Sequence, residues 1–148
     1  MHVRTLQRTQ RLNHAPPEVF AFFADARRLE EITPPLLRFR VVTPDPIEMA
    51  VGTFIQYRLR LRGVPVRWDT LIQAWEPPHR FVDVQVRGPY RLWHHTHEVA
   101  PLSDGGSQMT DTVRYALPFD RVAHRFVRRD LEAIFDYRAA RVPGLLDA

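Results

Sequence analysis

The sequence predicts a single α+β domain over residues 1–148, in which a curved antiparallel sheet of six or seven strands wraps around one long C-terminal helix. The length and the 45% content of hydrophobic residues suit one domain with a substantial core. Between residues 37 and 117 apolar residues alternate with polar ones, which is typical of strands joined by short turns. Beyond Pro118 the apolar spacing changes to three and four residues, which is typical of an amphipathic helix. Because a sheet needs a face covered and only this helix is long enough, we expect the helix to lie on the sheet.

The first forty residues predict one strand and two short helices. Residues 3–12 alternate loosely and are expected to form the first strand. Pro16-Pro17-Glu18 predicts the start of a helix, because proline is tolerated at the first helical position and an acidic residue suits the helix dipole there. A second short helix is expected at 26–32. It should end at Thr33-Pro34-Pro35, since the residue before a proline is driven out of the helical region.

Six further strands are expected in succession, which predicts an antiparallel meander. Turn residues such as Pro44-Asp45-Pro46 and Gly63 separate them. The expected strands lie at 37–41, 55–61, 66–74, 81–86, 93–99 and 109–117. The final helix is expected to cover about 20 residues from 120 to 141 and to be closed by Pro143-Gly144.

Charge and composition exclude several classes of protein. All 21 basic residues are arginine, which we interpret as a coding bias, and the net charge is +4. Arg58, Arg60 and Arg62 recur at every second position, which favours a solvated strand face over a nucleic-acid surface. The absence of cysteine excludes disulfides and cysteine zinc sites. With no long apolar run and no signal-peptide pattern, we expect a cytoplasmic protein without membrane insertion.

The candidate site lies on two neighbouring predicted strands. His95 and His97 share a face of one strand with Trp93, and Asp111 and Tyr115 share a face of the next. The turn signal Ser-Asp-Gly-Gly between them predicts a hairpin that brings these polar side chains together among apolar ones. Because buried polar groups are costly when unpaired, such a cluster is either satisfied internally or reserved for a ligand.

Three interpretations of this cluster compete. Two histidines and one carboxylate are an accepted metal-binding set, but no strong third ligand is evident, so we expect no metal and no cofactor. In a catalytic interpretation, His95 or His97 acts as a general base that Asp111 orients. We favour contact with a bound ligand. The orientation of Asp83 and Gln85 stays open, because Val82, Val84 and Val86 alternate with them and either set could face inward.

Two segments carry a resemblance to a known group of proteins. The order of the elements, with Ala15-Pro16-Pro17-Glu18-Val19-Phe20 and Trp75-Glu76-Pro77-Pro78-His79-Arg80-Phe81, resembles the START-like helix-grip superfamily, also called SRPBCC. That superfamily includes polyketide cyclases and lipid-transfer proteins. The residues from Gly88-Pro89-Tyr90 through Trp93, His95, His97 and Asp111 to Pro118 look like a bacterial branch described as ligand-binding. The resemblance implies the fold of the whole chain but supplies no catalytic residue.

We therefore expect a protein that binds or carries a small apolar or amphipathic ligand in a cavity between the sheet and the C-terminal helix. The alternative is an enzyme resembling polyketide cyclases or dehydratases, which would use a His–Asp pair in the same cavity. The residues expected to line the cavity are Tyr57, Trp68, Thr70, Gln85, Trp93, His95, His97, Asp111, Tyr115, Leu131 and Phe135. Arginines on the candidate edge strands discourage strand pairing between molecules, so we expect a monomer or a weak homodimer.

Overall fold

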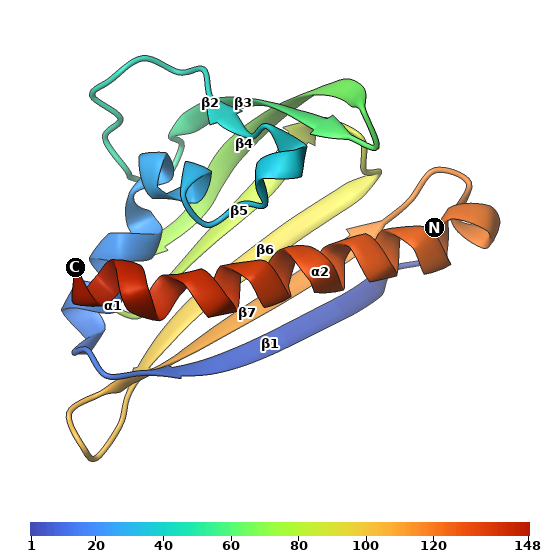
Figure 1. Cartoon of the computed structure of the whole chain (residues 1–148). Coiled ribbons are helices and arrows are strands. Elements are labelled where there is room, and N and C mark those ends of the chain that lie inside the picture. Colours follow the sequence, from blue (N-terminus) through green and yellow to red (C-terminus); the bar gives the residue numbers. More distant parts are fainter.

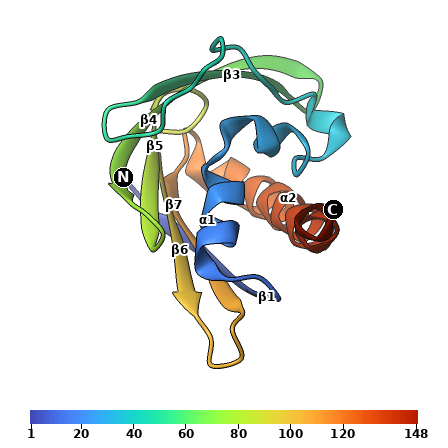
Figure 2. The same cartoon turned by 90° about the vertical axis from the view of Figure 1, so that its left-hand side faces the viewer.

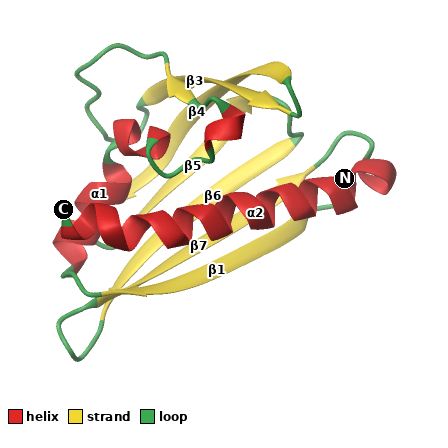
Figure 3. Ribbon diagram, in the orientation of Figure 1, coloured by secondary structure: helices red, strands yellow, loops and turns green.

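A seven-stranded antiparallel sheet and one long helix dominate the computed structural model, which describes all 148 residues (Figures 1 and 3). The strands follow the order β1-β7-β6-β5-β4-β3-β2 across the sheet, which confirms the predicted α+β fold and its meander. The strands are β1 (Arg4–Leu12), β2 (Arg40–Val41), β3 (Phe54–Leu61), β4 (Val64–Glu76), β5 (Arg80–Arg87), β6 (Leu92–Pro101) and β7 (Ser107–Ala116). The helices are α1 (Pro16–Ala24), the 3₁₀ helices η1 (Ala26–Glu30) and η2 (Pro35–Leu37), and α2 (Asp120–Asp147).

The sheet curls around α2, which lies along its concave side (Figure 2). The short helices α1 and η1 lie at the end of the sheet where α2 finishes (Figure 1). No helix of the structure combines the length and the apolar character needed to cross a membrane.

The largest hydrophobic core fills the end of the concave side beside α1; we call this region the packed end. Its buried residues come from α1, from the segment after η1, from the neighbouring ends of the sheet and from the last turns of α2. They are Leu12, Val19, Phe20, Phe22, Phe23, Ile32, Phe81, Val99, Met109 and Val142. Phe20 contacts Trp75 and Phe81 edge to face, at centroid distances of 5.2 and 5.6 Å. Such pairs add specific contacts to the burial of apolar surface, so this end is solid and well fixed.

Helix α2 is longer than the sequence predicts, because Pro143 does not end it. The helix has 28 residues and runs through Pro143 to Asp147. A proline inside a helix leaves the carbonyl four residues earlier without its donor. Here the side-chain amide of Gln10 on β1 donates to that carbonyl, on Ala139, at 2.7 Å. Val142 is fully buried at the packed end, so tertiary contacts hold the extra turns in place.

The segment from 26 to 41 also differs from the prediction. The second short helix is a 3₁₀ helix that ends at Glu30, and only Arg40 and Val41 of the expected strand at 37–41 pair with β3. The chain before them forms η2, which starts at Pro35 and ends at Leu37, and Arg38 follows in the left-handed conformation (φ 46°). Proline at the start of a turn and a left-handed residue at its end break an extended strand, although the apolar residues alternate.

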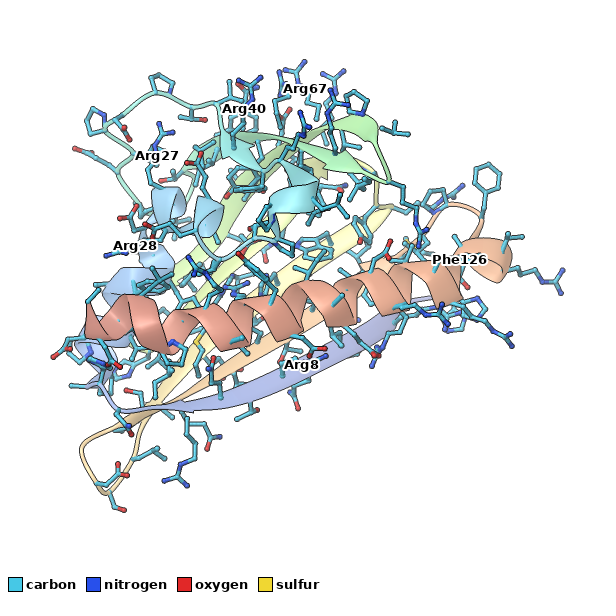
Figure 4. The ribbon with its side chains drawn as sticks, in the orientation of Figure 1. Arg8, Arg27, Arg28, Arg40, Arg67 and Phe126 are labelled. Atoms are coloured by element: carbon cyan, nitrogen blue, oxygen red, sulfur yellow. The ribbon has the colours of Figure 1, made fainter.

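The two edge strands are β1 and β2, and both carry arginines as expected. On β1, Arg4 and Arg8 form ion pairs with Asp120 and Asp136 of α2 at 2.7 and 2.6 Å, so these side chains tie the edge strand to the helix (Arg8 is labelled in Figure 4). Arg40 on β2 is exposed on the side of the sheet turned away from α2 (Figure 4). The expectation of a monomer or weak homodimer stays a prediction.

Candidate functional site

A pocket of about 160 Å³ lies between the concave face of strands β3 to β6 and the middle of α2. Most of its lining is hydrophobic, and polar side chains gather on the part formed by β5, β6 and α2. Eight of the residues that we expected in a cavity line it: Tyr57, Trp68, Thr70, Trp93, His95, His97, Leu131 and Phe135. The aromatic side chains Trp68, Tyr90 and Trp93 meet there with centroid distances of 4.8 to 5.5 Å.

The strand register decides the orientation that the sequence left open. Asp83 on β5 lies directly opposite His95 on β6, and His97 lies opposite Asp111 on β7. Opposed residues point to the same face of a sheet, so Asp83 joins the two histidines in the pocket. The sheet therefore carries two carboxylates beside the histidine pair, one on each neighbouring strand.

The two imidazoles lie between these carboxylates. His95 Nε2 donates to Asp111 Oδ1 at 2.7 Å, and His97 Nε2 donates to Asp83 Oδ2 at 2.5 Å. The remaining ring nitrogens face the opposite acids: His95 Nδ1 is 3.8 Å from Asp83 Oδ2, and His97 Nδ1 is 3.4 Å from Asp111 Oδ1. The rings stack on one another at 3.7 Å, and Phe81 stacks on His97 at 4.0 Å. Packing thus fixes the plane of His97 from both sides.

Arg138 brings a positive charge to this group from α2. Its guanidinium lies 5.1 Å from the ring centroid of Phe23 and 5.5 Å from that of Phe135, which favours cation–π attraction. Its Nη2 is 3.9 Å from Asp111 Oδ1, and neither Nε nor Nη2 makes a hydrogen bond although both atoms are buried. We call Asp83, His95, His97, Asp111 and Arg138 the buried polar cluster.

Burial and neighbouring charges shift the pKa values within the cluster. Burial and, to a smaller extent, the charge on His95 lower the pKa of His97 to about 4, against the opposite effect of Asp83 and Asp111. Burial alone would raise the pKa of Asp83, but the hydrogen bond from His97 and nearby charges bring it below its ordinary value. The pKa of Asp111 is also lowered overall: burial raises it, while the charge of Arg138 and the hydrogen bond from His95 outweigh that effect. At neutral pH both carboxylates are therefore ionised and His97 is neutral.

Three of the expected lining residues lie elsewhere. Gln85 closes the connection between β5 and β6, where its side chain accepts from the Tyr90 amide at 3.0 Å and donates to the Tyr90 carbonyl at 2.7 Å. Asp111 does not line the pocket: it lies behind the two histidines, and its Oδ1 is 2.7 Å from His95 Nε2 and 3.4 Å from His97 Nδ1. Tyr115 is fully buried in the core between β1, β7 and α2, and its hydroxyl contacts neither a histidine nor Asp111 through a hydrogen bond.

Three residues of the candidate site were missed or left undecided by the sequence. Arg138 has the helical spacing of the buried face of α2, and a cation at such a position is a signal that could have pointed to a buried charge there. Asp83 was left open because its strand alternates with valines. Tyr90 lies in a turn, where periodicity carries no information about orientation.

Comparisons with known proteins agree on the fold. The model of the family described as polyketide cyclase / dehydrase and lipid transport matches residues 4–143. A search among curated proteins finds no match. Among solved structures, the chain is similar to the Zhui aromatase/cyclase from Streptomyces sp. R1128, with 15% identity, a TM-score of 0.78, and coverage of 99% of this chain and 94% of that one.

Two further structures are similar over most of their length. Protein CV1439 from Chromobacterium violaceum shares 18% identity at a TM-score of 0.75, with coverage of 97% of this chain and 98% of that one. A norcoclaurine synthase point mutant from Thalictrum flavum, in complex with a transition state analogue, shares 11% identity at a TM-score of 0.72, with coverage of 98% and 94%. At these identities the likeness establishes the fold alone.

Proposed function

Because the chain belongs to the polyketide cyclase/dehydrase and lipid transport family, we propose that it binds a small apolar or amphipathic molecule in the pocket beneath α2. The observation that carries the proposal is the asymmetry of the lining: a mostly hydrophobic wall with Asp83, His95, His97 and Arg138 converging on one part of it. Ligand pockets in proteins combine such an apolar lining with a few polar groups that fix orientation. The apolar part of the ligand would lie against the aromatic wall and its polar end against the cluster.

The size of the pocket limits the ligand. An apolar cavity of about 150 Å³ holds one benzene molecule, and the pocket measures about 160 Å³. The edge-to-face rings of Trp68 and Trp93, 5.0 Å apart, offer both a face and an edge to an aromatic guest. We therefore propose a guest with one ring, or the ring-sized end of a longer molecule that extends out of the pocket.

A longer molecule would leave where exposed apolar side chains flank the pocket. Leu36 on η2 and Val64 at the turn between β3 and β4 are exposed, as is Phe126 on the first half of α2 (Figure 4). Arg62 joins the turn to the helix through Asp130 at 3.1 Å and lies over the Phe126 ring at 5.5 Å. This side of the molecule, which we call the open end, would admit the ligand.

Calorimetric titration with three ring-sized probes tests the proposal. The neutral p-cresol, the anionic benzoate and the cationic benzylamine share one ring and differ in the charge of the polar end. Ile134→Trp should abolish binding because Ile134 lines the pocket, whereas Ala133→Trp at the neighbouring exposed position should leave it unchanged. Equal binding by both variants, or no binding of any probe by the wild type together with no co-purified molecule in native mass spectrometry, would overturn the proposal.

A second candidate function follows from the contacts of His95. Its Nε2 donates a hydrogen bond to Asp111. Its Nδ1 makes no hydrogen bond and lies 3.8 Å from Asp83 Oδ2, on the side of the pocket. A histidine oriented by a carboxylate, with its other nitrogen turned to a pocket, has the arrangement of a general base. We propose as the alternative that His95 removes a proton from a carbon next to a ketone, as a cyclase or dehydratase requires.

Proton exchange tests this alternative without the natural substrate. Acetophenone is ring-sized and carries exchangeable protons next to its carbonyl, so NMR in D₂O would measure their exchange in the presence of the protein. General-base assistance contributes about 10²–10⁴-fold, and His95→Gln should remove that acceleration. Exchange at the same rate with wild type and His95→Gln would reject a catalytic role for His95 on ketones.

A further inference from the structure

We propose that Asp83, His95 and His97 together bind one divalent transition-metal ion at the polar side of the pocket. The sequence suggested no metal because a third strong ligand was lacking, and the strand register supplies it in Asp83. The proposed site stands on the geometry of these three side chains. It does not depend on whether the pocket also takes an organic molecule.

The three donor atoms are close enough to share one ion. One donor atom from each residue lies within 4.8 Å of the other two. Asp83 Oδ2 is 2.5 Å from His97 Nε2 and 3.8 Å from His95 Nδ1. Ligand atoms of a tetrahedral ion with bonds of about 2.0–2.1 Å lie about 3.3 Å apart. Binding therefore requires the Asp83–His97 distance to lengthen and the Asp83–His95 distance to shorten, each by less than about 1 Å.

The nitrogens that would not touch the ion already face a second carboxylate. His95 Nε2 donates to Asp111 Oδ1, which leaves a lone pair on His95 Nδ1 toward Asp83. His97 Nδ1 is 3.4 Å from the same Asp111 oxygen, and Arg138 approaches that oxygen from α2 at 3.9 Å. Metal-bound histidines almost always donate their other ring nitrogen to a carboxylate, carbonyl or water. His95 meets this condition at Asp111, and His97 Nδ1 faces the same oxygen without yet making a hydrogen bond.

Metal binding would also satisfy a buried atom that has no partner without it. When neutral His97 donates from Nε2 to Asp83, its Nδ1 holds a lone pair that faces the Asp111 carboxylate and makes no hydrogen bond. An ion on Nε2 would take the place of that proton, and the ring would carry its hydrogen on Nδ1 instead. Nδ1 would then donate toward Asp111, so the unpaired contact would become an attractive one.

The charge of the buried polar cluster favours a cation. Asp83 and Asp111 bring two carboxylates, whereas Arg138 is the only guanidinium among the cluster residues. Buried charges are costly unless they are paired or coordinate metals. Two imidazoles and one carboxylate are a ligand set that suits a divalent first-row ion such as Zn²⁺ or Fe²⁺. The remaining coordination positions of the ion would face the pocket, where water or a bound molecule could fill them. Coordination requires the stacked rings, now inclined by 25°, to tilt toward the ion.

Titration of the metal-free protein with Zn²⁺ and Co²⁺ tests the site. Tag-free protein would be treated with EDTA, exchanged into buffer at pH 7.5 and followed by calorimetry and by visible absorption of Co²⁺. Wild type should bind one equivalent, and Asp83→Asn and His97→Gln should lose at least about tenfold in affinity. Asp111→Asn should keep the stoichiometry and lose about 10–100-fold, the usual effect of removing a carboxylate behind a ligand. His94→Gln, on the same strand but the other face, should bind like wild type.

A second measurement on the wild type avoids variants that fail to fold. Ring-nitrogen NMR shifts should place Zn²⁺ on His95 Nδ1 and His97 Nε2, with the hydrogen of His97 on Nδ1. Circular dichroism and melting in EDTA would verify the fold of each variant. The proposal is overturned if Zn²⁺ leaves the ring-nitrogen NMR shifts of His95 and His97 unchanged, or if it shifts only those of His94. It is also overturned if folded Asp83→Asn binds Zn²⁺ as tightly as wild type. Binding of p-cresol in EDTA reports on the pocket separately, so the two proposals can fail independently.

Discussion

The two ends of the space beneath α2 are built from similar residues and differ in how they are filled. At the packed end, α1 and the last turns of α2 insert side chains such as Phe20 and Val142, which pack into one buried hydrophobic core. Toward the open end, the strands β3 to β6 curve around the middle of the same helix and leave about 160 Å³. The last turns of α2 are thus part of the hydrophobic core, whereas the middle of the same helix forms a wall of the pocket.

The difference shows that one end of the sheet contributes mainly to folding stability, whereas the other end is shaped for binding. The packed end has edge-to-face aromatic pairs and fully buried aliphatic side chains, so its contribution to folding is large. The pocket end keeps ionised groups in a partly apolar space, which is costly unless they are paired. The fold can tolerate that cost because the packed end supplies the compensating burial.

The largest expected effect is at the packed end. Val142→Asp would place an unpaired charge at a fully buried position and should destabilise the protein by several kcal/mol, on the order of a large fraction of a typical domain's stability. Chemical denaturation would measure it. Ala140→Asp, on the exposed face of the same helix, should change the free energy of unfolding by less than about 0.5 kcal/mol. Similar losses in the two variants would show that the end is not solidly packed.

The next effect is a dependence on pH that arises at the pocket end. In the metal-free protein the pKa of His97 is about 4, below its ordinary 6.5. Between these values the unfolded chain takes up a proton that the folded protein does not, so stability falls as the pH drops from about 6.5 to about 4. The loss is on the order of a few kcal/mol at most. Urea unfolding in EDTA at several pH values would measure the slope, and His97→Gln should reduce it.

His14 at the packed end provides the control for that measurement. Hydrogen bonds to Asp147 and Glu18 raise its pKa, so its contribution to stability is present at low pH and lost as the pH rises through the raised value. His14→Ala should therefore leave the slope below pH 6.5 unchanged. A slope that disappears in His14→Ala and persists in His97→Gln would contradict the assignment.

A smaller effect concerns the bond that carries α2 through Pro143. Gln10→Ala leaves the Ala139 carbonyl without a donor and should cost about 1–2 kcal/mol, with faster amide exchange in the last turns of α2. Gln7→Ala on the same strand loses only an exposed contact with Thr112 and should have little effect. Hydrogen exchange followed by mass spectrometry would separate the two. Unchanged protection in Gln10→Ala would mean that packing alone holds these turns.

The smallest effect is expected at the open end. Arg62→Ala removes an exposed ion pair with Asp130 and a contact with Phe126, and exposed pairs contribute about 0–1 kcal/mol. The melting temperature should therefore change little, and less in high salt than in low salt. A loss as large as that in Gln10→Ala would show that this turn is a structural support like those at the packed end.

Most of the fold follows from local patterns in the sequence. Alternation along β3 to β7 predicted the meander, and the three- and four-residue spacing after Pro118 predicted α2. The errors occur where tertiary contacts override local rules. Pro143 does not end α2 because a side chain from a distant strand replaces the missing donor, and the alternation at 37–41 is not realised because η2 turns the backbone.

Less of the candidate site could be predicted, because its geometry depends on register and on side-chain direction. Alternation predicted that His95 and His97 share a face, and the turn placed Asp111 beside them. The position of Asp83 depends on the pairing of β5 with β6, which alternation alone does not determine. Tyr115 lies opposite Trp93, further along the sheet, and its hydroxyl makes no hydrogen bond with either histidine.

The contacts between β1 and α2 join segments that are far apart in the chain. Arg4 meets Asp120 across 116 residues, and Gln10 meets Ala139 across 129. During synthesis the ribosome releases β1 long before α2, so the first strand must wait for its covering helix. Contacts of such sequence separation slow folding and leave apolar surface exposed meanwhile. The pocket, which residues of α2 help to line, therefore forms only after α2 emerges, and a molecule held beneath the helix can bind only after that last step.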